Sequence, residues 1–376
     1  MATPARDTAC RGEHVTSVLA APRGPSGAAR KSASTTSALS RSVDAAARAD
    51  LERKLGVSLR GEVRFDRATC GRYAADASIY QIMPVGVVFP KSEDDVEAVL
   101  AIAAEAGVSV IARGAGTSQN GQPIGAGLIV DFSRHLNAIR GYDDLGGTIR
   151  VEPGVVLEQL NSRLRRDGWF FPVEPSTASR CTIGGMAGNN SSGARSLRYG
   201  KMVDNVLALS GRLANGESFA FGEAVVPAAT RSAATTGLGE RMLALASRER
   251  TEIEAVYPKV QRRVGGYNLD ELLAAKPNLS HLLVGSEGTL ALTTEVGLKL
   301  ARLPAHRVIG VCQFPSFRSA METTRHLVAL GPVAVELIDN NVLELGAEIP
   351  IFRAALADMT RGRPNCLLVV EFAGED

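Results

Sequence analysis

The chain has 376 residues, 45% of them hydrophobic, so it is long enough to form two or more packed units. Its 42 basic and 40 acidic residues give a formal net charge of +2, which argues against nucleic-acid binding because that function needs a strongly basic surface. No apolar run approaches the ~18 residues of a membrane span, so we expect no transmembrane segment.

The cysteines and histidines give no sign of a metal centre. The five cysteines are far apart and form no Cys-x-x-Cys pair, and the five histidines show no spacing typical of metal ligands. We therefore expect reduced cysteines and no metal site.

Residues 1–41 are mainly Ala, Ser, Thr, Gly, Pro and Arg and show no apolar periodicity. This composition predicts a disordered basic tail. An Arg-rich, Ser-rich and acid-poor start is also typical of a mitochondrial transit peptide. We favour a plain tail and a cytoplasmic protein. The alternatives are peripheral attachment to the inner membrane or, if the tail is a transit peptide, a mitochondrial location.

The first predicted element is a short helix. Ser42 is its expected N-cap, Leu51 and Leu55 lie four residues apart on one face, and Gly56 is its expected end. A buried strand is predicted next over residues 85–90.

A strand, helix, strand unit is completed by residues 92–112. Ser92 and Asp95 predict a capping box, the helix is expected to end at Gly107, and residues 108–112 predict the second strand. A glycine-rich loop follows that strand, in a position where ligand-binding loops commonly lie.

This first loop, residues 112–118, has the composition of a diphosphate cradle. Gly114 and Gly116 remove side chains so that main-chain N–H groups can converge on an anion, and Thr117 and Ser118 add hydroxyl donors. Arg113 fits equally a phosphate-neutralising residue and a surface arginine beside a turn.

A second loop over residues 176–193 repeats the chemistry of the first. Strands at 128–131 and 148–151 and a helix ending at Gly168 precede it. The loop contains four glycines among neutral hydroxyl and amide side chains. Residues 183–189 predict one or two helical turns, whose main-chain donors could face an anion.

The rest of the chain continues as mixed helix and strand. A hairpin is predicted over 206–221 with its turn at Asn215 and Gly216, helical spacing returns over 237–275, and a glycine turn at 285–293 leads into a strand over 294–300.

Beyond Pro304 we expect a strand, helix, strand, helix, strand series. Its clear members are strands at 308–314, 333–338 and 366–372 and a helix near 316–330. We expect this last unit to be cut off, because these elements would leave sheet edges and an apolar face uncovered.

Three common phosphate or hydrolase motifs are absent. Gln119 stands where a dinucleotide-binding Gly-x-Gly-x-x-Gly needs its third glycine, Gln122 and Pro123 replace the Lys-Ser/Thr of a P-loop, and no Gly-x-Ser-x-Gly elbow occurs. Any one of the glycine loops alone is most simply a tight turn. Several neutral donor loops at the ends of predicted strands favour a cofactor that contains a diphosphate.

Taken in order, the motifs resemble those of a known family. They are Pro90–Val96, Ala112–Ser118, Pro175–Gly185, Asn189–Gly193, Tyr199-Gly200 and Gly285–Leu290. The chain resembles FAD-linked oxidases of the vanillyl-alcohol oxidase/p-cresol methylhydroxylase type over roughly residues 60–376. It is most similar to their D-lactate, glycolate and D-2-hydroxyglutarate dehydrogenase branch, some bacterial members of which append an iron–sulfur module.

The resemblance implies an α+β fold, with a two-lobed PCMH-type FAD-binding domain followed by the start of a ferredoxin-like α+β cap domain. The expected divisions are a tail at 1–41, a first lobe at 42–145, a second lobe at 146–303 and an incomplete cap at 304–376.

The resemblance also implies the residues that bind FAD. The first loop would wrap the diphosphate, the second would hold the diphosphate and ribityl region, and a third segment would lie along the cofactor. The predicted FAD-binding residues are Ala112, Arg113, Gly114, Ala115, Gly116, Thr117, Ser118, Ser176, Thr177, Ala178, Ser179, Arg180, Cys181, Thr182, Gly185, Asn189, Asn190, Ser191, Ser192, Glu287, Gly288, Thr289, Leu290, Ala291, Leu292 and Thr293. Some relatives attach FAD through a histidine in the first loop, where this chain has Thr117-Ser118-Gln119, so non-covalent FAD is expected.

The activity implied is a flavoprotein dehydrogenase that oxidises a D-2-hydroxy acid by hydride transfer to FAD, with an electron acceptor or iron–sulfur module as partner. No motif identifies the catalytic base or the residue that pairs with the substrate carboxylate, and His306 and His326 are expected to be structural or exposed. The alternatives are a non-catalytic flavin-binding fragment or subunit that needs a cap or partner and, more remotely, a nicotinamide enzyme.

Overall fold

The computed structural model describes residues 44–222 and 233–375, which form a mixed α+β structure around three main sheets. The predicted tail over 1–41 and the expected N-cap Ser42 lie outside the described residues. Within the described part, no helix is both long and apolar enough to cross a membrane.

The first sheet has four strands in the order β1-β2-β4-β3. Its strands are β1 (Glu62–Arg64), β2 (Gly86–Phe89), β3 (Val110–Arg113) and β4 (Leu128–Asp131). The last three are parallel, and β4 lies between β2 and β3, so the predicted strand, helix, strand unit has a third strand inserted into it.

Helices α1 (Ala45–Ser58) and α3 (Glu93–Glu105) cover one face of this sheet, and α2 (Arg67–Tyr73) contacts its other face. The predicted ends of α1 are wrong. Asp44 is the N-cap and accepts a bond from the Ala47 N–H, and the helix passes through Gly56 to Ser58. Buried Leu59 explains the longer helix, because it packs with Leu55 and donates its N–H to the Leu55 carbonyl.

The capping box predicted at Ser92 and Asp95 forms only in half. Ser92 Oγ accepts the Asp95 N–H, as predicted. The buried Asp95 carboxylate instead accepts the N–H groups of Lys91 and Arg60. It therefore ties the start of α3 to the segment before β1.

The second sheet has five antiparallel strands in the order β5-β6-β10-β8-β9. They are β5 (Ile139–Asp143), β6 (Thr148–Val151), β8 (Val206–Leu213), β9 (Ser218–Gly222) and β10 (Ala291–Lys299). The predicted hairpin is confirmed as β8 and β9, with Gly216 at φ 84° in its turn. β10 begins three residues earlier than predicted and is the central strand.

The largest core cluster lies against this second sheet. It combines strand residues with α4 (Leu157–Leu164), α5 (Ile183–Asn189) and α7 (Met202–Asn205). The 3₁₀ turn η1 (Arg165–Asp167) extends α4, and Gly168 ends it at φ 75°, as predicted. A short pair, β7 (Trp169–Phe170) and β11 (Ala301–Arg302), lies beyond it.

The helical region predicted over 237–275 is interrupted. It contains α8 (Ala233–Arg248), α9 (Arg250–Val256) and the 3₁₀ turn η3 (Asp270–Leu273), with α10 (Ser280–Leu283) after it. Residues 257–269 are irregular, which is consistent with Pro258 and the Gly265-Gly266 pair in that segment.

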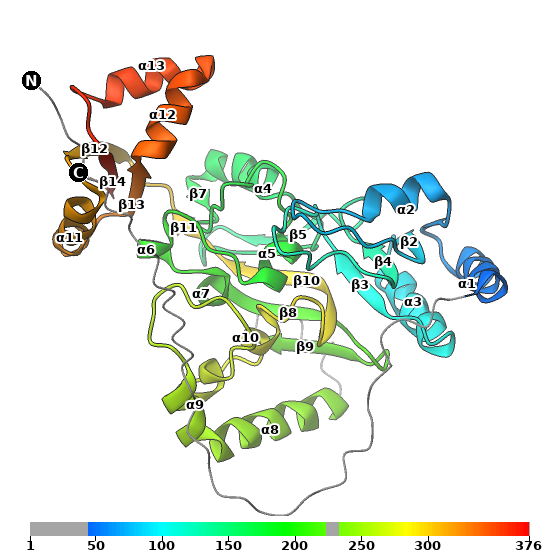
Figure 1. Cartoon of the computed structure of the whole chain (residues 1–376). Coiled ribbons are helices and arrows are strands. Elements are labelled where there is room, and N and C mark those ends of the chain that lie inside the picture. The colour runs from blue at the N-terminus through cyan, green and yellow to red at the C-terminus, as the bar shows by residue number, and fades with distance from the viewer. Residues whose placement is uncertain (1–43, 223–232, 376) are drawn as a thin grey trace, which may run out of the picture. The chain divides into compact units, whose positions relative to one another are not determined.

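The last unit is a three-stranded antiparallel sheet in the order β12-β14-β13 (Figure 1). Its elements are β12 (His306–Phe314), α11 (Phe317–Val328), β13 (Ala334–Asp339), α12 (Asn340–Glu348), α13 (Pro350–Met359) and β14 (Cys366–Gly374). The predicted strands are confirmed, and α11 packs on β14. Val308 and Ile309 of β12 are more than 60% exposed.

Asp95→Ala is expected to lower the free energy of unfolding by about 2 kcal/mol or more, because it leaves two partly buried N–H groups without an acceptor. Chemical denaturation measures the change. Asp94→Ala, at an exposed position in the same helical turn, is the control and should cost less than about 1 kcal/mol. Equal losses in the two variants would contradict this role for Asp95.

Candidate functional site

The two predicted glycine-rich loops and the third predicted segment meet around one cavity of about 440 Å³. Most of the lining residues come from three segments: the end of β3 and the loop after it (within 112–123), the second loop (within 175–192), and the turn that leads into β10 (within 286–293). Its volume is within the range of small-molecule and cofactor sites.

The first loop offers main-chain donors to this cavity. It leaves the sheet after Arg113, and Gly116 has φ 69°, a conformation that favours glycine. Among the described residues, the N–H groups of 115–119 have no hydrogen-bond partner. Such free donors in a concave loop are suited to an anion.

Gly114 allows the first loop to approach the second. A Cβ at this position would overlap Thr182 Oγ1 and lie 3.6 Å from the Gly185 Cα. The absence of a side chain therefore lets the two loops face the same space.

The sequence allowed two interpretations of Arg113, and the structure does not support the one in which it is a surface arginine beside a turn. Its guanidinium donates to the carbonyls of Tyr73, Ala75 and Pro123 and lies 5.0 Å from the centre of the Tyr73 ring. Burial lowers the pKa of this guanidinium from its ordinary value. Arg113 thus holds the first loop in place through these carbonyl contacts. Its predicted contact with phosphate stays a prediction.

The expected anion site at the start of α5 is wrong. The N–H groups of Ile183 and Gly184 bond to the carbonyls of Val155 and Pro153, and the Gly185 N–H bonds to Thr182 Oγ1, the side chain of the N-cap. Because these donors are already satisfied, the free N–H groups of the first loop are better placed to bind an anion.

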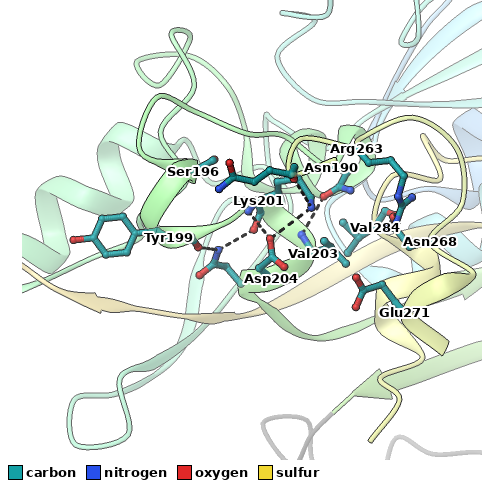
Figure 2. Close-up of polar contacts among 12 residues, drawn as sticks. Asn190, Ser196, Tyr199, Lys201, Val203, Asp204, Arg263, Asn268, Glu271 and Val284 are labelled. Carbon is teal, nitrogen blue, oxygen red and sulfur yellow. Dashed lines mark hydrogen bonds and ion pairs between the residues drawn. The ribbon is translucent and has the colours of Figure 1, made fainter. Parts of the chain in front are cut away.

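Asn190 ends α5 and supplies a different kind of donor. It is fully buried, has φ 48°, and accepts the Val203 N–H on Oδ1 at 3.1 Å (Figure 2). Its Nδ2 has no partner among the described residues, although the side chain lines the cavity. A buried amide without a partner is costly, so this group is suited to an acceptor on a bound ligand.

Glu287 reaches the first loop from the third segment. It has φ 52°, which is unusual for glutamate, and its N–H bonds to the Gly188 carbonyl. Its carboxylate accepts a bond from Gln122 Nε2 at 3.2 Å, and Gln122 Oε1 accepts a bond from the Ser118 hydroxyl. This chain of side chains links two walls of the cavity.

Twenty of the 26 predicted FAD-binding residues line the cavity, and six do not: Ala178, Ser179, Arg180, Thr289, Leu290 and Leu292. Ser179 and Arg180 are exposed. Leu292 is buried in the core under the first sheet, because side chains alternate along β10 and only Ala291 and Thr293 face the cavity.

Several cavity residues carry no sequence signal for this role. They include Gln122, Pro153, Leu209, Val264 and Leu283. Most are apolar or single residues on elements distant in sequence, so only the fold brings them together. Cys181 was predicted, and burial raises the pKa of its thiol, which keeps the sulfur neutral.

Metal ligands and histidines are not gathered at this cavity. Among the residues described, no group of three or more His, Cys, Asp or Glu side chains could hold a metal ion, and no histidine lines the cavity. His306 on β12 and His326 on α11 are both away from its lining.

Two family models match the chain. Residues 84–222 match the FAD binding domain, and residues 303–376 match the C-terminal domain of FAD linked oxidases. The first match contains two of the three segments that form the cavity.

Similar proteins include D-2-hydroxyglutarate dehydrogenase from Escherichia coli, which is 36% identical over 318 residues. That match covers 81% of this chain and 31% of the relative, so the chain spans about a third of its length. Glycolate oxidase subunit GlcD from Bacillus subtilis is 29% identical over 294 residues, covering 76% of this chain and 53% of the relative.

Among solved structures, p-cresol methylhydroxylase with substrate bound has a TM-score of 0.64 at 16% identity. The match covers 89% of this chain and 62% of that one. It confirms the predicted fold class.

Gly114→Ala is expected to destabilise the protein by about 1–3 kcal/mol, because the new methyl group overlaps Thr182 Oγ1. Thr182→Ala alone should cost about 1 kcal/mol through loss of the N-cap. The double variant should lose less than the sum of the two, as measured by denaturant unfolding.

Gly71→Ala in α2 is the matched control, since nothing lies within 4 Å of the added Cβ. It should be neutral or slightly stabilising. Strict additivity of Gly114→Ala and Thr182→Ala would show that the two positions are not in contact.

Proposed function

We propose that the chain, which belongs to the FAD-linked oxidases, is an FAD-dependent dehydrogenase. Its substrate would be a D-2-hydroxy acid such as D-lactate, glycolate or D-2-hydroxyglutarate. The cavity carries this proposal, because it offers free main-chain donors at 115–119 and the unpaired amide of Asn190. Neutral donors of these two kinds suit a ligand with an anionic diphosphate and polar ring acceptors.

The residues present fit FAD. The first loop would hold the diphosphate, Asn190 Nδ2 would donate to an acceptor on the cofactor, and Glu287 would accept bonds from its hydroxyl groups. No histidine is present at 117–119, so non-covalent binding is proposed. When bound, FAD supplies the hydride acceptor for oxidation of the substrate α-carbon.

The chain's own contribution is to bind and orient the cofactor. Arg113 and Gly114 fix the first loop, and the Ser118–Gln122–Glu287 chain links it to the turn that precedes β10. A fixed set of donors costs little reorganisation when the ligand binds, which favours affinity.

We propose that the electron acceptor is a separate protein or an iron–sulfur module. No cluster of cysteines that could hold such a module occurs among the described residues, so the electrons would leave to a group outside them. For the location we propose the cytoplasm, with attachment to the inner membrane or, if residues 1–41 are a transit peptide, a mitochondrial location as the alternatives.

A second candidate function is a flavin-binding subunit that needs a partner for catalysis. The observation in its favour is that no histidine lines the cavity within the described residues. Turnover of D-lactate, glycolate or D-2-hydroxyglutarate by the purified chain with an artificial electron acceptor would exclude this candidate. Flavin binding without turnover of any of the three would support it.

The purified chain, reconstituted with FAD, should show flavin absorption bands that persist after gel filtration. Gly116→Val should raise the Kd for FAD at least about tenfold, because φ 69° is unfavourable for valine and its side chain would meet the Arg113 guanidinium. Gly185→Val should weaken binding in the same titration, because it narrows the cavity near Thr182.

Gly56→Val is the control, since the added Cβ meets nothing within 4 Å and lies in α1. It should keep the wild-type flavin content. Absence of flavin bands in the wild type would refute FAD binding, and normal flavin content in both cavity variants would refute this placement of the cofactor.

A further inference from the structure

Arg195 connects the cavity segments to the C-terminal sheet. It follows the cavity-lining residues 189–192 and precedes the short helix α6 (Ser196–Tyr199). Its side chain is 21% exposed and bonds to two carboxylates, Glu174 and Glu371, that are far apart in sequence. Neither Arg195 nor Glu371 lines the cavity.

On one side, Arg195 fixes the second loop at its start. Nη1 donates to Glu174 Oε2, and Glu174 directly precedes the cavity residues 175–177. Glu174 Oε1 also accepts a bond at 3.2 Å from buried Asn161, whose amide holds both the N–H and the carbonyl of Phe171. The Glu174 carboxylate is therefore held between the core and Arg195.

On the other side, Arg195 makes a two-pronged contact with β14. Nε and Nη2 donate to Glu371 Oε2 and Oε1 at 3.1 and 3.0 Å. Glu371 is central in the C-terminal sheet, because it pairs with Ile309 of β12 and Ala334 of β13. The planar fork of arginine fixes the orientation of a carboxylate as well as its distance.

A second bond supports the same junction. Arg198 Nη1, in α6, donates to the Ala373 carbonyl at 2.8 Å. The other cations near the two carboxylates are weaker partners, since Arg165 is 3.9 Å from Glu174, Arg307 is 3.9 Å from Glu371, and each is about half exposed. Arg195 is thus the main partner of both carboxylates.

We propose that Arg195 is a positioning residue that couples the C-terminal sheet to the cofactor cavity. It holds β14 and the cavity segments 175–177 and 189–192 in one arrangement, so that FAD affinity depends on Glu371, a residue outside the cavity. This inference rests on the proposed function only in that FAD is the ligand whose affinity is measured.

The test compares FAD affinity in Glu371→Gln, Arg195→Lys, Arg195→Gln and the double variant Arg195→Gln/Glu371→Gln. Flavin fluorescence during titration of the apoprotein gives Kd. Glu371→Gln should raise Kd about fivefold or more, and the double variant should be no worse than Arg195→Gln alone, because both changes break the same contact. Arg195→Lys keeps the charge and loses the fork, so its Kd should lie between those of the wild type and Arg195→Gln.

Hydrogen exchange in the apoprotein gives a second readout that needs no flavin. The amides of residues 189–193 should exchange faster in Glu371→Gln than in the wild type. Glu336→Gln is the matched control, since Glu336 is an exposed glutamate on β13 of the same sheet. It should change neither Kd nor exchange.

The outcomes separate the two proposals. If the wild type binds no FAD, the proposed function fails, and faster exchange in Glu371→Gln alone still supports the coupling. If the wild type binds FAD while Glu371→Gln matches it in Kd and in exchange, the coupling is overturned. An equal effect of Glu336→Gln would also overturn it, because any weakening of the sheet would then suffice.

Discussion

The candidate site depends on how the partly buried guanidinium of Arg113 holds the first glycine-rich loop. Three main-chain carbonyls, from two separate segments, accept bonds from this one side chain. The carbonyls are thereby satisfied without using N–H groups of the loop, which remain free at 115–119. A surface loop would give such donors to water, whereas here they line a cavity in which a ligand can replace that water.

The two main glycine-rich loops look alike in sequence, yet their main-chain donors have different uses. At the start of α5, Gly184 allows the backbone to lie against Pro153, and the donors there bond to other protein groups. In the first loop, Gly116 turns the chain at positive φ, and the N–H groups of 115–119 have no partner among the described residues. Composition predicts that both loops are tight, but only the packing partners decide which of them can bind an anion.

Local signals predicted most of the elements well. Strands such as β4 and the β8–β9 hairpin follow from short apolar runs and a turn at Asn215-Gly216, which depend on neighbouring residues. The order of the strands does not follow in this way, because β4 enters between β2 and β3 and β10 enters between β6 and β8. The same limit applies to the site. The sequence motifs of the loops predicted Asn190 and Glu287 as site residues. The unpaired amide of Asn190 and the bond from Gln122 to Glu287 could not be predicted, because they depend on how distant segments pack together.

Arg195 extends this reasoning from the cavity to the C-terminal unit. Arg195 holds both carboxylates at once, because each partly buried carboxylate needs a cation to offset the cost of its desolvation. The cavity segments and β14 therefore share one electrostatic contact, while the hydrophobic cores behind them are separate clusters. Separate cores joined by a polar contact can shift relative to each other at lower cost than a single packed core. A movement of the C-terminal sheet would therefore reach the cofactor cavity first through the contact of Arg195 with Glu371, because Arg195 also holds the cavity segments.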